Sequence, residues 1–266
     1  MNISAIIAIF AAVILLLCSH RAEGASMVSL IQPSAIMIVL GGTFCAALVN
    51  FSPSTLKHAL VASKDVFFDK KPSHMKVIDE IIYLAHEARV KGLFSLNNMI
   101  DKIKDPFLKR GIQLSIDFNN PQMIYDILKA EISYEEEEEL INSRIFEALG
   151  GYAPTFGIVG AVFGLIQIMA YIQQPDILAQ GIAVAFVSTL YGVGFANLFF
   201  LPVAGKLKMN TREKILLKEV ILQGIVSIQM EEHPMVIEEK LLAYLKYHSN
   251  PTSIENKKHS GVHRIG

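Results

Sequence analysis

The stretch EALGGYAPTFGIVGAVFGLIQIMAY, residues 147–171, decides the fold of this chain. After its first residue it carries no charge, and it is long enough to cross a bilayer, whose core about 30 Å thick needs roughly 20 apolar residues in a helix. It also contains a proline, a threonine and five glycines. Because small residues let membrane helices approach one another closely, this pattern predicts a membrane helix with a close neighbour.

The composition extends this prediction to the whole chain. Of the 266 residues, 52% are hydrophobic and none is tryptophan, and the mean hydropathy is +0.40, which is too apolar for an ordinary soluble domain. Four segments are candidate spans: residues 3–18, 31–51, 154–171 and 181–203. None of the last three contains Asp, Glu, Lys, Arg or His. We therefore predict an all-α integral membrane protein with four transmembrane helices, bound to the lipid bilayer.

The first candidate span has an alternative interpretation as a signal peptide. The run LLLC that ends at Cys18 has the shape of a lipoprotein cleavage site. The preceding MNIS, however, has no Lys or Arg, which secretory signals usually carry. We predict that the first span is retained. The two cysteines, Cys18 and Cys45, lie in or beside apolar spans and do not indicate a disulfide framework.

The distribution of charge predicts the orientation. A formal net charge of −1 gives no reason to expect a nucleic-acid partner. Lysines and arginines follow the second and fourth spans, whereas the connection IQQPDILAQ between spans three and four has no basic residue. By the positive-inside rule, residues 52–150 and the tail after residue 203 are then cytoplasmic. We predict a multi-pass protein of the bacterial inner membrane with both termini in the cytoplasm.

Helix signals divide the chain further. Ser73 precedes a helical pattern that Gly92 ends, and Asp105 and Asn120 each precede a proline, as N-caps often do. One long helix is expected from about residue 135 into the third span, and its acid run 135–139 is either a solvated face or a docking surface. We predict the following regions: residues 1–51, spans one and two; 52–150, a cytoplasmic helical domain; 151–203, spans three and four; 204–248, cytoplasmic C-terminal helices; and 249–266, a disordered tail.

Small residues form a stripe on each of the last two spans. On the third span they recur at helical spacing from Ala153 through Gly157 to Gly164, and on the fourth from Gly181 through Ala185 to Gly192. Two interpretations stay open. The stripes pack helix against helix, or they line a slot for a group that belongs to another chain.

The spans also lack any group that could carry an ion through lipid. Such intramembrane ionisable groups are rare and functional where they occur, so either the protein moves no ions or a partner supplies the titrating group. The polar atoms that remain include the hydroxyls of Thr155, Ser188, Thr189 and Thr43. A hydroxyl in a span often bonds its own helix, but it can also serve a partner's carboxylate or water.

Several motifs resemble the MotA/PomA family of bacterial flagellar stator subunits. They are PTFGIVGAVFGLI, VSTLYGVGFANLFFLPVAGKL, LAHEARVKGLFSL, DPFLKRGIQL and HPMVIEEKLLAYL, which stand in the family's order. The resemblance implies a homopentamer around a dimer of a single-span MotB-like protein, whose membrane aspartate carries the ion. It also implies a cytoplasmic domain that pushes the rotor protein FliG. No enzymatic activity and no cofactor are implied, and the coupling ion is expected to be H⁺.

The same resemblance assigns roles to particular residues. Pro154 and Pro202 match the prolines at the cytoplasmic ends of spans three and four, and Thr189 matches a threonine that lines the ion path. Ala161 stands where sodium-driven relatives have a threonine, which favours protons. Further candidates for the ion path and its gating are Ser188 and Thr155.

In the cytoplasmic domain, Arg89 matches a rotor-facing arginine, whereas Asn97 stands where the family has an acid. Lys91, Asp101 and Glu87 are further candidate rotor contacts, and which acid replaces the missing one stays open. Alternatives to the proton-driven stator are an ExbB/TolQ-type energiser, a sodium-driven PomA-type stator, and a self-sufficient channel or scaffold.

Overall fold

The computed structural model describes residues 3–22, 30–64, 73–170 and 175–249, and every regular element in these ranges is helical. The helices are α1 (Ile3–Ala22), α2 (Pro33–Ile36), η2 (Met37–Gly41), α3 (Gly42–Asn50), α4 (Pro53–Ala62), α6 (His74–Lys91), η3 (Leu93–Lys102), α7 (Pro106–Asp117), α8 (Pro121–Ala170), α9 (Pro175–Phe195), η4 (Ala196–Phe200), α10 (Leu201–Gln229) and α11 (Pro234–Ser249). The all-α prediction is confirmed for these residues.

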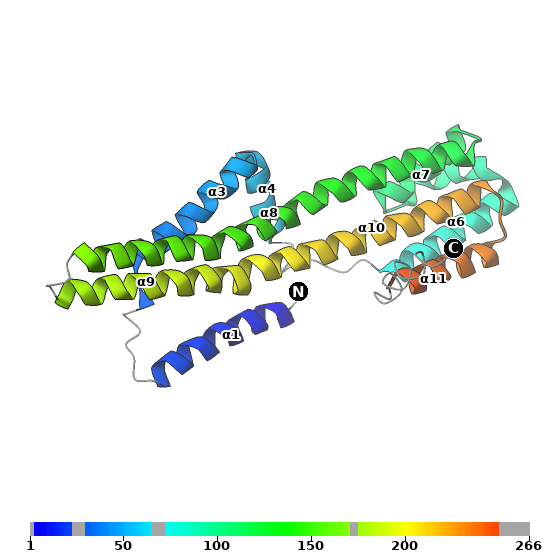
Figure 1. Ribbon diagram of the computed structural model, residues 1–266. Coiled ribbons are helices and arrows are strands. Elements are labelled where there is room, and N and C mark those ends of the chain that lie inside the picture. Colours follow the sequence, from blue (N-terminus) through cyan, green and yellow to red (C-terminus); the bar gives the residue numbers. More distant parts are fainter. Residues whose placement is uncertain (1–2, 23–29, 65–72, 171–174, 250–266) are drawn as a thin grey trace, which may run out of the picture. The chain divides into compact units, whose positions relative to one another are not determined.

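The helices form two compact units. Unit 1 combines Met1–Lys70 with Glu138–Asn210, and unit 2 combines Lys71–Glu137 with Thr211–Gly266. The long helices α8 and α10 therefore each contribute to both units. Within unit 1, α8 and α9 run side by side (Figure 1).

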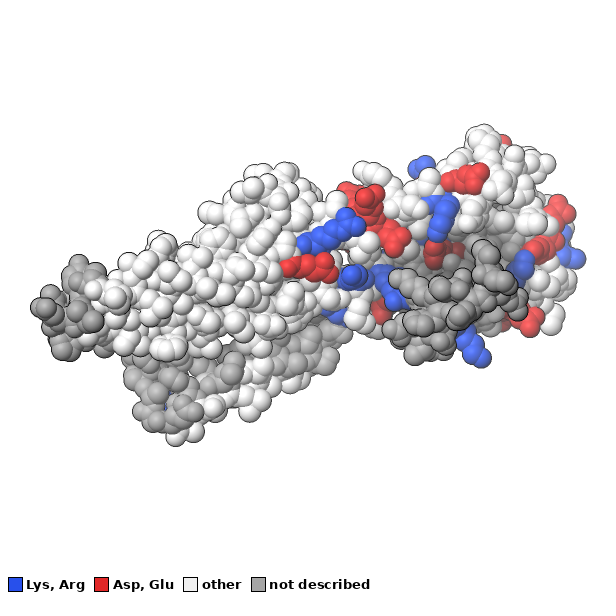
Figure 2. All heavy atoms as spheres, viewed as in Figure 1, with Lys and Arg blue, Asp and Glu red and all other residues white. Residues whose placement is uncertain are grey.

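Three helices of the described chain are long and apolar enough to cross a membrane: Pro33–Asn50, Pro121–Met169 and Gly181–Gln229. They contain the second, third and fourth predicted spans. The first predicted span falls on α1, whose apolar part, Phe10–Ser19, is shorter. A helix at this position is confirmed, whereas its crossing of the membrane stays a prediction. In Figure 2, uncharged residues, drawn white, cover the span-forming segments of unit 1, whereas both basic and acidic side chains are scattered over unit 2.

The predicted helix signals are mostly confirmed. The Asp105 carboxylate accepts hydrogen bonds from the backbone N–H groups of Phe107 and Leu108, both at 2.9 Å, and the Asn120 side chain accepts one from the Met123 N–H at 3.1 Å. Gly92 ends α6 with φ of 82°, a conformation that favours glycine. Ser73 precedes α6, but its side chain makes no capping bond.

The predicted long helix into the third span is confirmed, but it begins earlier than expected. No break separates the helix that starts at Pro121 from the span, so α8 runs for 50 residues. The predicted pair of C-terminal helices is α10 and α11, which meet at residues 230–233. Of the predicted tail 249–266, only Ser249 lies within the described residues.

Each unit has its own core. In unit 1, Phe146 of α8 is fully buried beside Phe200 of η4, with ring centroids 6.5 Å apart, and Phe44 of α3 meets Phe200 edge to face. In unit 2, aliphatic side chains from α6, α7, α8 and α10 pack together, among them Ile78, Ile81, Leu108, Ile112, Leu128, Ile221 and Ile225. Burial of each such side chain contributes about 1.5–3 kcal/mol to the free energy of folding. The packed core thereby fixes where the polar residues at the surface of its unit lie.

Candidate functional site

The helices α8 and α9 of unit 1 bring their small residues into direct contact. A Cβ atom added to Gly192 would lie 2.6 Å from the carbonyl oxygen of Ala153 and 3.0 Å from the Cα of Gly157. Both of these are backbone atoms, which cannot rotate out of the way. The two helices therefore touch backbone to backbone at this level, and Gly192 permits the approach.

Gly164 and Gly181 make a second contact of the same kind. A Cβ on Gly164 would lie 2.6 Å from the carbonyl oxygen of Gly181 and 2.7 Å from the backbone nitrogen of Ala185. The stripes of small residues therefore face each other, and the packing interpretation is confirmed. The other interpretation, a slot lined by these glycines, is wrong, because the opposite helix fills the space beside them.

The candidate threonines lie on exposed parts of these helices. Thr189 is exposed, and its hydroxyl donates to the carbonyl oxygen of Ala185 at 3.2 Å. Thr155 is exposed as well and donates to the carbonyl oxygen of Tyr152 at 2.6 Å. Each hydroxyl hydrogen is thus used within its own helix, but the oxygen lone pairs remain available as acceptors.

Ser188 lies elsewhere, although it is the neighbour of Thr189 in sequence. Its side chain is fully buried between α8 and α9, and its hydroxyl has no hydrogen-bond partner among the described residues. The Ser188 oxygen would be 2.6 Å from a Cβ on Gly160, so it occupies the space that this glycine leaves free. A buried hydroxyl without a partner costs about 1–3 kcal/mol. Ser188 and Thr189 therefore do not share one exposed face.

Both candidate prolines lie within continuous helical backbone. Pro154 is inside α8, and its Cα would be 3.2 Å from a Cβ on Gly192, so this proline packs against α9. Pro202 is exposed and lies two residues after the end of the π-helical turn η4. A proline has no N–H and clashes with the carbonyl four residues earlier, here that of Leu198. Because Leu198 belongs to η4, the wider turn is the expected response to Pro202.

Ala161 and Asn197 lie in the same part of unit 1 as these residues. Ala161, the other candidate of the ion path, is half-buried on α8. Asn197 is not among the residues predicted from the sequence. It is exposed at the start of η4, two turns beyond Thr189, and its side-chain amide donates to the carbonyl oxygen of Val193 at 2.9 Å. The signal was present in the sequence, since Asn197 is the only amide side chain among residues 181–203.

The predicted rotor contacts lie in unit 2. Arg89 is exposed on the last turn of α6, and its guanidinium donates to the carbonyl oxygen of Glu231 at 3.3 Å. Glu231 has a positive φ of 55° in the turn after α10. Arg89 thus helps to hold this turn and still presents its charge to solvent.

The other three predicted contacts are engaged in ion pairs. Lys91 Nζ lies 2.7 Å from the carboxylate of Glu87, one turn away on α6, and the hydrogen bond that Lys91 donates to Glu87 raises the pKa of Lys91. Asp101 of η3 lies 3.1 Å from Lys109 of α7. Exposed pairs of this kind contribute only about 0–1 kcal/mol, but each lysine reduces the charge that its acid presents to a partner.

The chain is similar to known proteins over most of its length. Residues 99–220 match the family described as the MotA/TolQ/ExbB proton channel family, and residues 6–92 match the Motility protein A N-terminal family. Motility protein A of Bacillus subtilis is 33% identical, over 92% of this chain and 91% of its own.

Two solved structures have the same fold. The first is the C. jejuni MotAB structure, with a TM-score of 0.86 and 28% identity over 94% of this chain and 98% of the matched chain. The second is the flagellar MotAB stator complex from Bacillus subtilis, with a TM-score of 0.82 and 33% identity over 92% and 95% of the two chains.

Proposed function

The chain belongs to the MotA/TolQ/ExbB proton channel family, and on this premise we propose that it is the MotA-type stator subunit of a bacterial flagellar motor. In this role it couples ion flow across the inner membrane to rotation of the flagellar rotor. The observation that carries the proposal is the likeness of more than nine-tenths of the chain, parts of both units included, to chains of MotAB stator complexes. The protein is then a coupling device and not an enzyme.

The function requires a partner that carries the ion. Residues 31–51, 154–171 and 181–203 hold no ionisable side chain, and such a group is what ion transfer through lipid normally needs. A dimer of single-span MotB-like proteins supplies it as an aspartate, and five copies of this chain surround that dimer. The exposed hydroxyls of Thr155 and Thr189 and the exposed amide of Asn197 offer oxygen acceptors to such an aspartate or to its water. We also propose that the chain crosses the membrane four times and that both of its termini lie in the cytoplasm.

The runner-up, an ExbB/TolQ-type energiser, shares one family with the proposed stator. The match of residues 6–92 to the N-terminal region of Motility protein A favours the stator. That region comprises the first two predicted spans and the helix α6 that carries Arg89, features that a proton-driven energiser without a rotor does not require.

We predict that protons drive the motor. Ala161 offers no oxygen ligand at the position where the resemblance places a threonine in sodium-driven relatives, and Na⁺ needs such oxygens more than a proton does. In a strain that lacks its own stator, co-expression of this chain with its MotB-like partner should restore rotation. The speed should follow the proton-motive force at constant sodium. A speed that tracks sodium at constant proton-motive force would overturn this assignment, and no rotation at all would overturn the stator function.

We further predict that Arg89→Glu strongly lowers motor torque, because it reverses a charge that unit 2 presents to the rotor. Reversal of an acid on FliG should restore part of the torque. Arg89→Gln serves as the control for structure, since it removes the charge but keeps a donor for the Glu231 carbonyl. Torque can be measured with beads attached to flagellar stubs. If Arg89→Gln and Arg89→Glu are equally stable and both turn at the normal torque, Arg89 has only a structural role.

A further inference from the structure

The short helix α4 of unit 1 follows the second predicted span almost at once. The apolar helix Pro33–Asn50 ends with α3, and α4 begins at Pro53 after only Phe51 and Ser52. The Ser52 hydroxyl caps α4 by accepting a hydrogen bond from a backbone N–H of its first turn at 3.2 Å. In Figure 1, α3 extends away from α8 and α4 turns back toward it. Because so short a link joins α4 to a span, α4 lies at the membrane surface.

One face of α4 is packed and the opposite face is open. Leu56 and Ala59 are 7% and 0% exposed and belong to the core of unit 1. Lys57, Val61 and Lys64 stand three or four residues apart, so they lie on one side of the helix, and all three are exposed. The core contacts fix the rotation of α4, so this side faces away from the protein.

The exposed face combines two lysines with two aliphatic side chains. Leu60 is 41% exposed and Val61 is 55% exposed, and they stand between Lys57 and Lys64 in the sequence. This combination is typical of helices that lie in the membrane interface, with apolar side chains toward the acyl chains and basic side chains toward the headgroups. The methylene groups of each lysine allow its ammonium group to reach the headgroup level.

The positive charge of this part of unit 1 is not neutralised within the chain. Residues 50–64, 140–153 and 200–210 supply the core that holds α4, and they contain five lysines and arginines but one acid, Glu147. Glu147 lies 3.8 Å from Lys208. Lys57 and Lys64 make no ion pair with any residue of the described chain. Both lysines are therefore available to an anion from outside.

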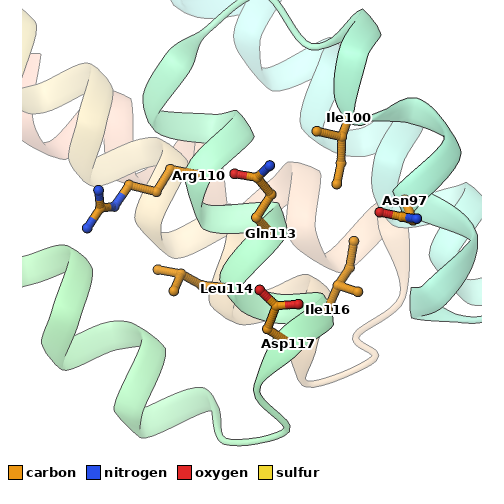
Figure 3. Close-up of a pocket in the computed structure, with 7 residues that line it drawn as sticks. All are labelled: Asn97, Ile100, Arg110, Gln113, Leu114, Ile116 and Asp117. Carbon is orange, nitrogen blue, oxygen red and sulfur yellow. The ribbon is translucent and has the colours of Figure 1, made fainter.

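A cavity between η3 and α7 of unit 2 differs in this respect. Arg110 is the one basic residue that lines it, and its Nε lies 3.0 Å from the Glu131 carboxylate. Figure 3 shows the Asp117 carboxylate in the same lining. Acids thus offset the positive charge of this cavity, whereas no such acid offsets Lys57 and Lys64 on α4.

We propose that the exposed face of α4 binds anionic phospholipids of the cytoplasmic leaflet in preference to neutral ones. This inference rests on the proposed function for the side of the membrane on which α4 lies. Lys57 and Lys64 donate charge-assisted hydrogen bonds to the headgroup phosphates, and Leu60 and Val61 contact the upper part of the acyl chains. Attraction to an anionic membrane surface amounts to about a fivefold gain in association for each basic residue.

The absence of tryptophan from the chain allows a direct test. Val61→Trp places a single fluorophore on the exposed face of α4. The full-length variant is reconstituted into phosphatidylcholine vesicles that contain brominated phosphatidylglycerol or, at the same mole fraction, brominated phosphatidylcholine, because bromine quenches a neighbouring tryptophan. Phosphatidylglycerol should associate about fivefold or more strongly than phosphatidylcholine. Adding Lys57→Gln and Lys64→Gln should abolish this preference, and Leu60→Trp should report the same preference as Val61→Trp.

The matched control is Lys102→Gln with Lys104→Gln, which removes two exposed lysines of unit 2 and should leave the preference unchanged. Salt at 1 M should weaken the preference, because the Debye length falls from about 10 Å at 0.1 M to about 3 Å. Thermal unfolding checks that each variant is folded. Equal quenching by the two lipids in Val61→Trp would overturn the inference. Quenching by neither lipid would show that a second copy or another protein covers α4, and would overturn it as well. A wild-type chain that restores no rotation would overturn the stator function without altering the quenching result.

Discussion

Replacing Gly192 by valine is expected to abolish swimming, because it separates α8 from α9. The first added carbon would lie 2.6 Å from the Ala153 carbonyl oxygen, 3.0 Å from the Cα of Gly157 and 3.2 Å from the Cα of Pro154. All three atoms belong to the backbone, so relief requires the helices to move apart. Overpacking of a core typically costs about 1–3 kcal/mol where side chains can adjust. Because backbone atoms cannot adjust in this way, the cost of Gly192→Val should lie at or above the upper end of this range.

The matched control is Gly194→Val on the same helix. A Cβ at Gly194 has no atom of the described chain within 4 Å, yet the change in residue type and in helix propensity is the same. Thermal unfolding of the purified chain should show a midpoint lower by roughly 6–12 °C for Gly192→Val and little change for Gly194→Val. Equal midpoints for the two variants would show that the contact at Gly192 is not needed for the stability of unit 1.

How much of the fold the sequence predicts depends on how far along the chain each sequence signal acts. The starts of α7 and α8 and the end of α6 were predictable, because Asp105, Asn120 and Gly92 act within four residues of themselves. The stripes of small residues were visible too. Their partner was not, since a stripe only permits close approach, and only the folded chain shows that Gly192 meets Gly157.

The candidate site shows the same limit. Adjacent residues in a helix lie about 100° apart, so Ser188 is buried and Thr189 is exposed although both are hydroxyl residues in one apolar run. Nothing local distinguishes them. Likewise, the pairing of Asp101 with Lys109 depends on how η3 packs on α7. The sequence offered several acids for this region without indicating which of them is unpaired.

The largest functional effect without loss of structure is expected from Thr189→Val. Valine keeps the shape of threonine and replaces the hydroxyl by a methyl group. The one described hydrogen bond of this hydroxyl runs to its own helix, to the Ala185 carbonyl. Unit 1 should therefore remain intact. If the Thr189 oxygen accepts a hydrogen bond from the partner's aspartate or from its water during ion transfer, the loss of this acceptor costs about 1–3 kcal/mol. The rate of ion transfer would then fall about five- to 150-fold.

Thr189→Ser separates the oxygen from the shape of the side chain. It keeps the hydroxyl and removes a methyl group, so its swimming speed should stay close to that of the wild type, whereas Thr189→Val should swim slowly or not at all. Co-purification with the MotB-like partner checks that both variants assemble. Normal speed in Thr189→Val would exclude a role for this oxygen. Equal impairment of both variants would show that the hydroxyl does not account for the effect alone, because Thr189→Ser keeps the hydroxyl and loses only the methyl group.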